Sequence, residues 1–552
     1  MKQSVVLVMA ALAAAQAVAQ VPVIPPSADP GAIQRRQMEE EQRRRQEEQE
    51  RQQPTAPIDK GALARPAEKP LDNTTRFLVR EITFSPSKIL TRAQLDKAAA
   101  AYLGKEVTLA DLQELTAAIN AVYQARHIVT AEAIIPPQDV TQGVVHIRLI
   151  EGKVGHTTVS GNASTRASYI ENRLHLEPKS LVDLDQLESS MIRFNRTNDA
   201  QLRAALNPGT DPGTTDFQID VTEPKRDDLR VILDNLGSPA TGRTRLMAAY
   251  VRHSVFGRRD DFSVSDTAST GDNSSAIGYG MPVNTYGGRV DLGFNLDKTA
   301  IKNGGLQSLN ITGESRAWTL TLRQPTYLTQ RAQVDFIVGA QRRDSTNWID
   351  EVFLNDTKTR SKNLGMEAQL FREKDYWFGS WTRSFCTATV LTPVKLIIDR
   401  GSLRYNHDFG QGITLNSSYT WQAAPIKSLP SSEQFFIGGD ASVVGYTVAS
   451  ESGYNGQVVD FDLHHPLAVW TWWNQKVTAT GVFSLDYGTV TPYLPPGSEL
   501  LAHDHLAGLG WGVNAAIGQR ANARVTWGYG MTSGVSTLRD KILLFQVTSG
   551  VF

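Results

Sequence analysis

The chain has 552 residues, with 56 basic and 57 acidic side chains, a formal net charge of −1 and a single cysteine. This near-neutral balance argues against nucleic acid as a partner, because phosphate binding needs a surplus or stripe of basic side chains. The lone Cys386 excludes an internal disulfide and any metal site built from several cysteines. At about 150 residues per domain, the length allows three or four domains.

Residues 1–19 are typical of a secretory signal peptide. Lys2 supplies a short positive region, the stretch from Val5 to Ala15 is apolar, and Ala17-Val18-Ala19 offers a small-x-small cleavage site. No later stretch reaches the roughly 18 apolar residues that a membrane-spanning helix needs. No cysteine follows the cleavage site, so we expect an exported protein that is soluble or a β-barrel rather than lipid-anchored.

Residues 20–75 form a region of unusual composition. A Pro-rich start leads into residues 34–53, which hold six Arg, six Glu, seven Gln and one Met, and residues 54–75 resemble a Pro-rich linker. Residues 34–53 favour helix throughout, but that helix has no apolar face to bury. Two interpretations remain open: a solvated helix or disordered tail, and a movable plug in a polar pore.

Two α/β units follow in tandem, at residues 76–151 and 152–224. Each shows the order β-α-α-β-β, and in the first unit Thr91 to Gln94 and Thr108 to Asp111 start the two helices as capping signals. A unit with two helices and three strands leaves open sheet edges, where an extended chain can add a strand through main-chain hydrogen bonds. The alternative is a generic α/β fold without a binding role.

The first unit resembles the polypeptide-transport-associated (POTRA) domain of two-partner secretion transporters, the haemolysin-activator and filamentous-haemagglutinin-transporter family. The positions that carry this resemblance surround a strand pair and include Pro136, Pro137, Gln138, Glu151 and Gly152. In the second unit, Ser160-Gly161-Asn162 and the stretch from Leu206 to Asp216 fit the same family. The resemblance implies two POTRA domains ahead of an outer-membrane barrel.

From residue 227 to 552 the pattern changes to short alternating strands separated by polar turns. Val290, Leu292 and Phe294 alternate with polar residues or glycine, as do Ala523, Val525 and Trp527. One apolar and one polar face suit a transmembrane β-barrel, and a soluble β-sandwich is the alternative. The resemblance implies sixteen antiparallel strands, and the terminal Phe552 is the usual last residue of such barrels. The predicted fold class is therefore α+β POTRA domains followed by an all-β transmembrane barrel.

Two further motifs resemble signatures of this superfamily. The first is a long extracellular loop whose tip contains Gly438, Gly439, Val443, Val444, Gly445 and Tyr446. The second is a barrel strand containing Asp486 and Gly488. The family usually carries arginine where this chain has Val444, which removes the usual cation for the aspartate.

Strand alternation predicts which side chains of these motifs face the lumen. Phe483, Leu485 and Tyr487 share one face, so Asp486 takes the other, and the same argument turns Asp460 and Asp462 inward. We expect the loop tip to insert into the barrel even without its arginine, and Asp486 to pair with another inward base such as Arg524. On this interpretation Val444→Arg is tolerated or tightens the loop.

No catalytic, cofactor or metal site is predicted. The chain lacks the G-x-x-x-x-G-K-[ST] phosphate loop, and Gly508, Gly510 and Gly512 lie in a strand pattern, where they smooth the barrel wall. We interpret residues 503–505 (His-Asp-His) as a solvated loop, and His464 and His465 as strand-end residues. We expect no enzymatic activity.

The resemblance implies a function as well as a fold. It predicts an outer-membrane pore that recognises a large unfolded exoprotein, through its amino-terminal secretion domain, with POTRA domains in the periplasm, and exports it without ATP. Outer-membrane lipid and the barrel-assembly machinery, which would insert the pore itself, are the other expected partners, and nucleic acid is not. The alternatives are a barrel-assembly factor of the same superfamily and a passive porin.

Overall fold

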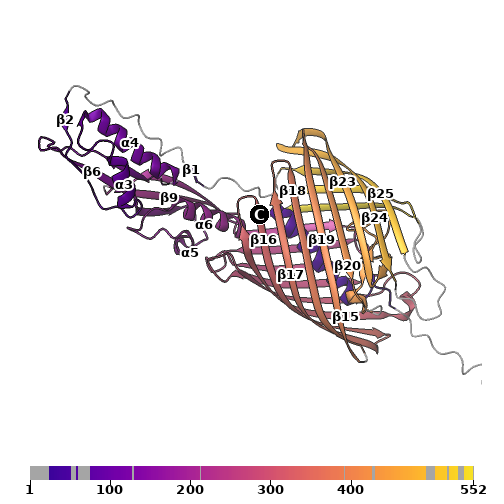
Figure 1. Ribbon diagram of the computed structural model, residues 1–552. Coiled ribbons are helices and arrows are strands. Elements are labelled where there is room, and N and C mark those ends of the chain that lie inside the picture. Colours follow the sequence, from indigo (N-terminus) through magenta and orange to yellow (C-terminus); the bar gives the residue numbers. More distant parts are fainter. Residues whose placement is uncertain are drawn as a thin grey trace, which may run out of the picture.

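The computed structural model describes residues 24–50, 58–59, 75–126, 128, 130–211, 213–390, 392–425, 429–492, 504–518, 521–532 and 540–550. The predicted signal peptide, most of the linker and the terminal Phe552 lie outside these ranges. Two small α/β units project from one end of a β-barrel, and a helix from the start of the chain lies inside the barrel (Figure 1). No described helix is long and apolar enough to cross a membrane.

The first α/β unit has the predicted order of elements, with two additional short strands. Its elements are β2 (Phe77–Leu78), β3 (Glu81–Phe84), α3 (Arg92–Ala99), β4 (Glu106–Val107), α4 (Leu109–Ala125), β5 (Ala131–Ile134) and β6 (Val144–Glu151). Strand β6 lies between β3 and β5 in a three-stranded sheet. Both predicted capping boxes are present, at Thr91 and Thr108. Helix residues such as Leu112 and Leu115 pack with the strand residues Val145 and Ile147 in one buried core.

The second unit consists of β7 (Lys153–Ser160), α5 (Ala167–Leu174), α6 (Leu184–Thr197), β8 (Gln201–Pro208) and β9 (Thr214–Thr222). The open sheet edge expected here is partly covered. Strand β1 (Ile58–Asp59), from the linker, pairs in parallel with β8. This pairing could not be predicted from the sequence, because two residues in a Pro-rich segment carry no strand pattern.

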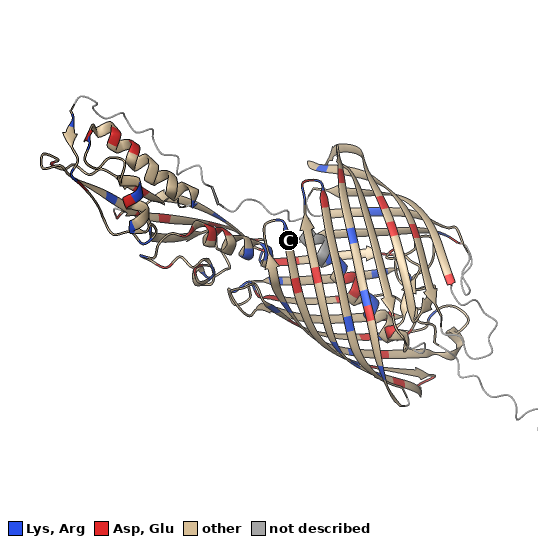
Figure 2. Cartoon of the chain, viewed as in Figure 1, with Lys and Arg blue, Asp and Glu red and all other residues tan. Residues whose placement is uncertain are grey.

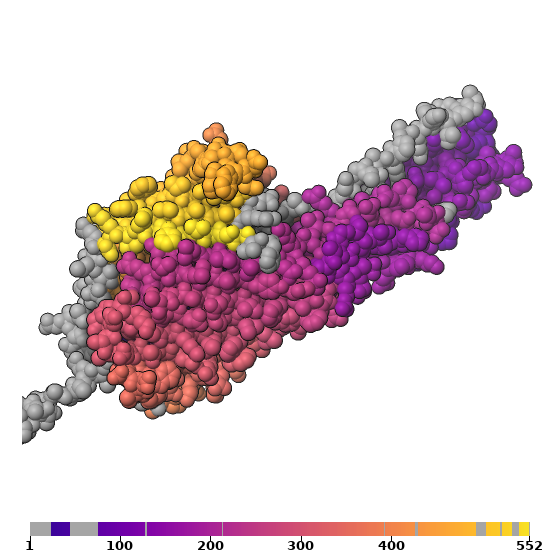
Figure 3. All heavy atoms as spheres, turned by 180° about the vertical axis from the view of Figure 1, so that it is seen from behind, coloured from indigo at the N-terminus to yellow at the C-terminus, as the bar shows by residue number. Residues whose placement is uncertain are grey.

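The barrel is closed and consists of sixteen strands, as the resemblance implied. They are β10 (Asp227–Asp234), β11 (Arg245–His253), β12 (Asp261–Ala268), β13 (Asp272–Pro282), β14 (Arg289–Ala300), β15 (Ile311–Leu328), β16 (Ala332–Ile349), β17 (Val352–Phe371), β18 (Asp375–Thr389), β19 (Pro393–Gly410), β20 (Ile413–Ala423), β23 (Asn455–Trp472), β24 (Gln475–Thr491), β25 (Asp504–Ile517), β26 (Ala521–Gly530) and β27 (Lys541–Gly550). The last strand pairs antiparallel with the first. In the view from behind, the yellow carboxy-terminal part of the barrel lies directly beside the magenta part that begins it (Figure 3).

The barrel is apolar outside and polar inside, which confirms the predicted alternation. Phe483, Leu485 and Tyr487 are each nearly half exposed on the outer face, whereas Asp486 is 6% exposed on the inner face. Charged residues on other strands, such as Asp297 and Arg343, are also buried inside. The backbone groups of the strands pair around the closed sheet, as hydrocarbon requires.

Several barrel strands are longer than the sequence suggested. Strand β17 has 20 residues, about twice the roughly ten that span a bilayer, so these strands extend beyond the membrane. Strand β23 continues to Trp472, so His464 and His465 lie within a strand rather than at its end. Residue 503 is outside the described ranges, but Asp504 is buried at the start of β25, which corrects the solvated-loop interpretation.

Helix α2 (Pro30–Glu50) is the charged helix of the sequence analysis, beginning four residues earlier than predicted. Asp29 caps its start, because the Asp29 Oδ1 atom accepts a hydrogen bond of 2.9 Å from the Ala32 N–H. Proline suits the first position of a helix, where its missing N–H is not needed. The helix contacts β14, β15 and β16 inside the barrel, so the structure favours the plug over the disordered tail.

Candidate functional site in the barrel lumen

The first turns of α2 contact the inner barrel wall through Gln34. Its side-chain oxygen accepts hydrogen bonds of 3.0 Å from both Ser315 Oγ and Arg343 Nε. Its amide nitrogen donates to the carboxylate of Asp297. Donors and acceptors of the amide are thus matched by wall residues of β14, β15 and β16.

The next turn of α2 adds charged contacts with the wall. Gln37 donates a 3.1 Å hydrogen bond to Asp272 Oδ2, and Glu40 forms a 3.4 Å ion pair with Arg245, whose other partner is Asp234. The Nε and Nη1 atoms of Arg36 are buried without a hydrogen-bond partner among the described residues. Unsatisfied buried donors cost free energy, so this part of the interface is not optimised for tight binding.

Helix α2 also contacts the long loop that folds into the lumen between β20 and β23. This loop contains η3 (Ser431–Glu433), β21 (Phe435–Ile437) and β22 (Glu451–Gly453). Glu433 is buried between Arg343 at 3.3 Å and Arg400 at 2.8 Å. The Arg35 guanidinium lies 5.0 Å from the ring centre of Phe436, and it donates to the carbonyl of Gln434. The loop therefore forms part of the surface that holds the helix.

The loop tip is inserted, as expected, and it reaches the strand of Asp486. The backbone N–H of Val444 donates a 2.8 Å hydrogen bond to Asp486 Oδ2. Val443 and Tyr446 are almost completely buried, and they pack with Ile437, Val458, Val490 and Leu506. The backbone N–H of Val444 is thus the hydrogen-bond donor to Asp486, in place of the arginine that the family usually has.

Glycines of the barrel wall make room for the tip. A Cβ atom at Gly508 would collide with the Val444 carbonyl oxygen, and one at Gly528 would come within 2.5 Å of the Gly445 nitrogen. Gly445 itself has φ +91°, a backbone conformation that favours glycine. Gly508 and Gly510 lie in the barrel wall, as predicted, but their contact with the tip could not be predicted, since strand periodicity carries no information about a distant loop.

Tyr446 joins the tip to the extracellular ends of two further strands. Its hydroxyl donates to the backbone carbonyl of Thr532 at 2.6 Å, and the Thr532 N–H donates back to that hydroxyl at 3.0 Å. The hydroxyl also lies 3.0 Å from the Ala507 carbonyl oxygen. The remaining motif glycines, Gly438 and Gly439, both have positive φ at the turn that starts the tip.

Two expectations for this region need correction. Arg524 forms an ion pair with Asp440 of the loop, and Asp486 takes the Val444 N–H instead. The side chain of Val444 does not face the carboxylates; it packs against Gly510, Ile542 and Leu544. An arginine at position 444 would therefore lose this apolar packing, and we no longer expect it to tighten the loop.

The other inward carboxylates are satisfied by neighbouring hydroxyl groups. Ser484 Oγ donates a 2.5 Å hydrogen bond to Asp462, and Ser418 donates to Asp460. The Cβ of an alanine at Gly488 would lie 3.0 Å from Val443 Cγ2, so this motif glycine also borders the tip. No group of three His, Cys, Asp or Glu side chains among the described residues could hold a metal ion.

The POTRA motif residues support the fold of the first α/β unit. Gln138 holds β6 through its side chain, which accepts from the His146 N–H at 2.7 Å and donates to the His146 carbonyl at 2.8 Å. Glu151 accepts hydrogen bonds from the N–H groups of residues 88 and 89. A Cβ at Gly152 would lie 2.6 Å from Thr130, while Pro136 and Pro137 follow the end of β5.

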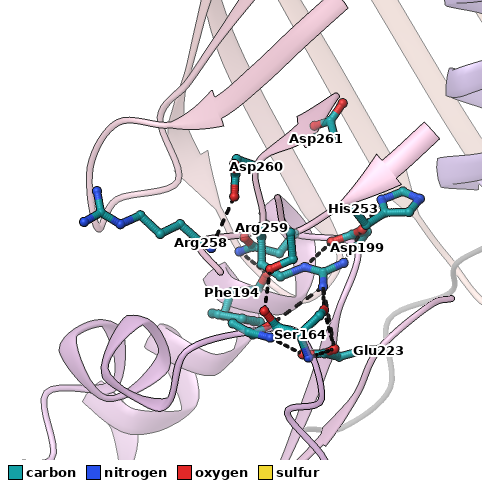
Figure 4. Close-up of polar contacts among 12 residues, drawn as sticks. Ser164, Phe194, Asp199, Glu223, His253, Arg258, Arg259, Asp260 and Asp261 are labelled. Carbon is teal, nitrogen blue, oxygen red and sulfur yellow. Dashed lines mark hydrogen bonds and ion pairs between the residues drawn. The ribbon is translucent and has the colours of Figure 1, made fainter. Parts of the chain in front are cut away.

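The second α/β unit is joined to the barrel by a buried charge cluster that sequence reasoning missed (Figure 4). Arg259, in the turn between β11 and β12, has a fully buried side chain whose Nε donates to Asp199 Oδ1 at 2.6 Å. His253 lies 2.7 Å from the same carboxylate, and Glu223 lies 4.0 Å from Arg259. These groups lie far apart in the sequence, so only the fold brings them together.

The charge cluster shifts the titration of Asp199. Burial raises the pKa of its carboxyl, but the hydrogen bonds from His253 and Arg259 outweigh burial and lower the pKa to about 2. Close packing accompanies the charges: at Gly257, with φ +76°, a Cβ would lie 2.7 Å from Arg166 Cγ. The barrel and the second unit therefore meet through a specific, tightly packed contact.

Comparison with known proteins agrees with this architecture. A family model for the ShlB-type POTRA domain matches residues 77–152, and one described as haemolysin secretion/activation protein ShlB/FhaC/HecB matches residues 213–515. The chain is 24% identical over 405 residues to the heme/hemopexin transporter protein HuxB of Haemophilus influenzae, covering 70% of this chain and 71% of HuxB. It is 23% identical over 409 residues to the outer membrane transporter CdiB of Dickeya dadantii, covering 69% of this chain and 71% of CdiB.

Solved structures show the same fold. CdiB from Escherichia coli superposes with a TM-score of 0.66 at 20% identity, covering 96% of this chain and all of that chain. BamA from Haemophilus ducreyi lacking POTRA domains 1–3 superposes with a TM-score of 0.51 at 11% identity, covering 86% of this chain and all of that chain. Because the ShlB/FhaC/HecB model matches more than half of the chain, the protein belongs to that family of two-partner secretion transporters of the bacterial outer membrane.

Proposed function

We propose that the two POTRA domains, at residues 76–151 and 152–224, bind an unfolded exoprotein in the periplasm. The exoprotein then crosses the outer membrane through the lumen of the barrel at residues 227–552. The observation that carries this proposal is the lumen itself: it is lined by polar side chains, and α2 occupies it through hydrogen bonds and ion pairs. Water can replace such contacts, so the helix can leave and open a hydrated path.

Membership of the family supports a secreted protein as the cargo. HuxB is described as a heme/hemopexin transporter and CdiB as an outer membrane transporter. The chain has no G-x-x-x-x-G-K-[ST] motif for a nucleotide. Export would then draw its free energy from folding of the partner outside the cell, since a folded chain cannot slide back through the pore.

A secretion assay separates this function from barrel assembly. Loss of the gene is expected to stop export of one exoprotein and to leave the assembly of other outer-membrane barrels unchanged. A general defect in barrel assembly would instead identify an insertase, which the fold shared with BamA allows.

The role of the first POTRA domain has its own test. Deletion of residues 76–151 is expected to abolish exoprotein secretion, because recognition is lost, while the barrel still folds and shifts on heating in gel electrophoresis. Secretion that survives this deletion would contradict recognition by that domain.

A further inference from the structure

A patch of basic side chains covers part of the outer barrel wall. It consists of six residues on the four consecutive strands β14 to β17: Lys298, Arg316, Arg342, Lys358, Arg360 and Lys362. Strand alternation turns each of them outward, because Ser315, Arg343 and Thr359, next to them in sequence, are buried on the inner face. Blue bands cross these strands in Figure 2. We call these six residues the basic patch.

The basic patch lies at the extracellular end of the apolar band. Strand β10 starts at the POTRA domains, so successive strands alternate in direction and β15 runs from the outside toward the periplasm. On β15, Arg316 is therefore closer to the extracellular end than Trp318 and Leu320, two outward-facing residues that are 61% and 45% exposed. On β17, Lys362 is likewise closer to the extracellular end than Leu364. The patch thus meets the membrane where acyl chains give way to headgroups.

The carboxylates nearby do not neutralise the basic patch. Arg316, Arg342 and Lys358 have carboxylate partners two residues away on their own strands, at 2.5, 2.8 and 2.8 Å. Lys298, Arg360 and Lys362 form no ion pair with another described residue. The six cations and these three carboxylates leave an excess of three positive charges on one area of the wall.

Two arginines of the patch face each other directly. Arg342 on β16 and Arg360 on β17 are register partners, and both point outward. Like charges at directly opposite positions destabilise a sheet, and among the described residues Asp344 pairs with Arg342 alone, so a further anion between the two arginines would relieve their repulsion. Guanidinium groups bind phosphate through paired hydrogen bonds, and lysines add point charges.

We propose that the basic patch binds the phosphate groups of a glycolipid in the outer leaflet of the outer membrane. The acyl chains of the same lipid would pack on the exposed apolar residues just below, including Trp318 and Leu320. Single outward cations occur in the corresponding part of other strands, such as Lys395 on β19 and Lys541 on β27, while β13 and β24 carry the neutral Asn273 and Thr489 there, so the cations are concentrated on β14 to β17. The lipid would therefore bind on one side of the barrel.

Native mass spectrometry of the full-length protein in detergent tests this proposal. The probes are purified phosphorylated lipid A, the same lipid after removal of its phosphates, and inorganic phosphate. The test variant is Arg342→Gln/Arg360→Gln/Lys362→Gln, and the matched control is Lys541→Gln, which removes an outward cation from β27. Heat-modifiability in gel electrophoresis checks that each variant folds.

We expect the triple variant to bind phosphorylated lipid A at least about tenfold more weakly, which corresponds to about 1.4 kcal/mol. The control should bind like the unaltered protein, and inorganic phosphate should not compete at concentrations near that of the lipid. Equal binding of dephosphorylated lipid, an equal loss in the control, or full competition by inorganic phosphate would each overturn the proposal. None of these results depends on secretion.

Discussion

Two segments fill the lumen of this barrel, and they are held in different ways. Apart from its first turn, where Ala32 and Ile33 are buried, helix α2 contacts the wall through polar and charged side chains, and Arg36 keeps buried donors without a partner among the described residues. The loop tip at residues 443–446 interlocks with wall glycines and buries Val443 and Tyr446 almost completely. Water can replace the hydrogen bonds of polar side chains when the helix leaves, whereas it cannot replace the packing contacts of buried apolar side chains.

The difference indicates which segment moves. Removal of α2 exposes mainly side chains that water solvates well, with Ala32 and Ile33 as the buried apolar exceptions, so its free-energy cost is modest. Removal of the tip would open a cavity, expose apolar side chains and leave Asp486 without the Val444 N–H. We infer that α2 is the detachable plug and that the tip stays in place.

Disulfide tethers should separate the two segments most clearly. A Cβ at Gly31 lies 2.7 Å from Ser345 Oγ, so Gly31→Cys with Ser345→Cys can tether α2 to β16. We expect oxidation to abolish exoprotein secretion and a reductant to restore it. The buried Cys386 should not interfere.

The matched tether holds the loop tip. A Cβ at Gly510 lies 3.1 Å from Val444 Cγ1, so Val444→Cys with Gly510→Cys can join the tip to β25. Secretion should continue in this variant under oxidising conditions. Loss of secretion here, or its survival with α2 tethered, would reverse the assignment of the mobile segment.

The next largest effect is expected on thermal stability, when a methyl group is added to a wall glycine that contacts the loop tip. Gly508→Ala places a methyl group against the Val444 carbonyl oxygen, so the tip must shift at a cost of about 3 kcal/mol. The measurement is the temperature at which the folded band disappears in heat-modifiability assays. Gly379→Ala is the control, because its Cβ would meet only a Leu403 methyl at 3.9 Å; equal losses in both variants would refute the interlock.

A smaller effect is expected for Val444→Arg. The pocket of Gly510, Ile542 and Leu544 cannot hold an unpaired charge, so the arginine side chain must turn toward the hydrated lumen and lose the packing of Val444, at a cost of about 1–2 kcal/mol. The same thermal assay measures it, with Val444→Ile as the apolar control. Stabilisation by arginine would show that its side chain reaches the carboxylates of the lumen after all.

The smallest effect concerns the charge cluster outside the membrane. The pKa of Asp199 is lowered to about 2 in the folded protein, against about 3.9 for a free aspartate, so its contribution is complete above pH 3.9. It should fade as the pH falls from 3.9 toward 2. Limited proteolysis with an acid-active protease should then cut between residues 222 and 227 faster. Asp199→Asn should weaken this pH dependence and leave the part due to Glu223, whose pKa burial raises but hydrogen bonds from Ser164 and Thr165 lower by more. A cleavage rate that stays the same between about pH 3.9 and pH 2 would contradict a stabilising role for the charge cluster.

Sequence reasoning predicted what depends on local periodicity and composition. Alternation placed Asp486 inside the barrel, and capping signals at Thr91 and Thr108 marked two helices correctly. It missed what depends on segments that meet only in the fold, such as Arg259 with Asp199 and Gly508 with Val444. For the same reason, no local signal distinguished Arg524 from a backbone N–H as the partner of Asp486.

Single-channel conductance in planar bilayers tests most directly whether α2 is a plug. The variant lacking residues 20–53 is compared with the unaltered protein and with the oxidised tether between positions 31 and 345. If α2 closes the lumen, the deletion raises conductance and the tether holds the channel in its low-conductance state. An unchanged conductance after deletion would contradict the account, because the helix would then not obstruct the pore.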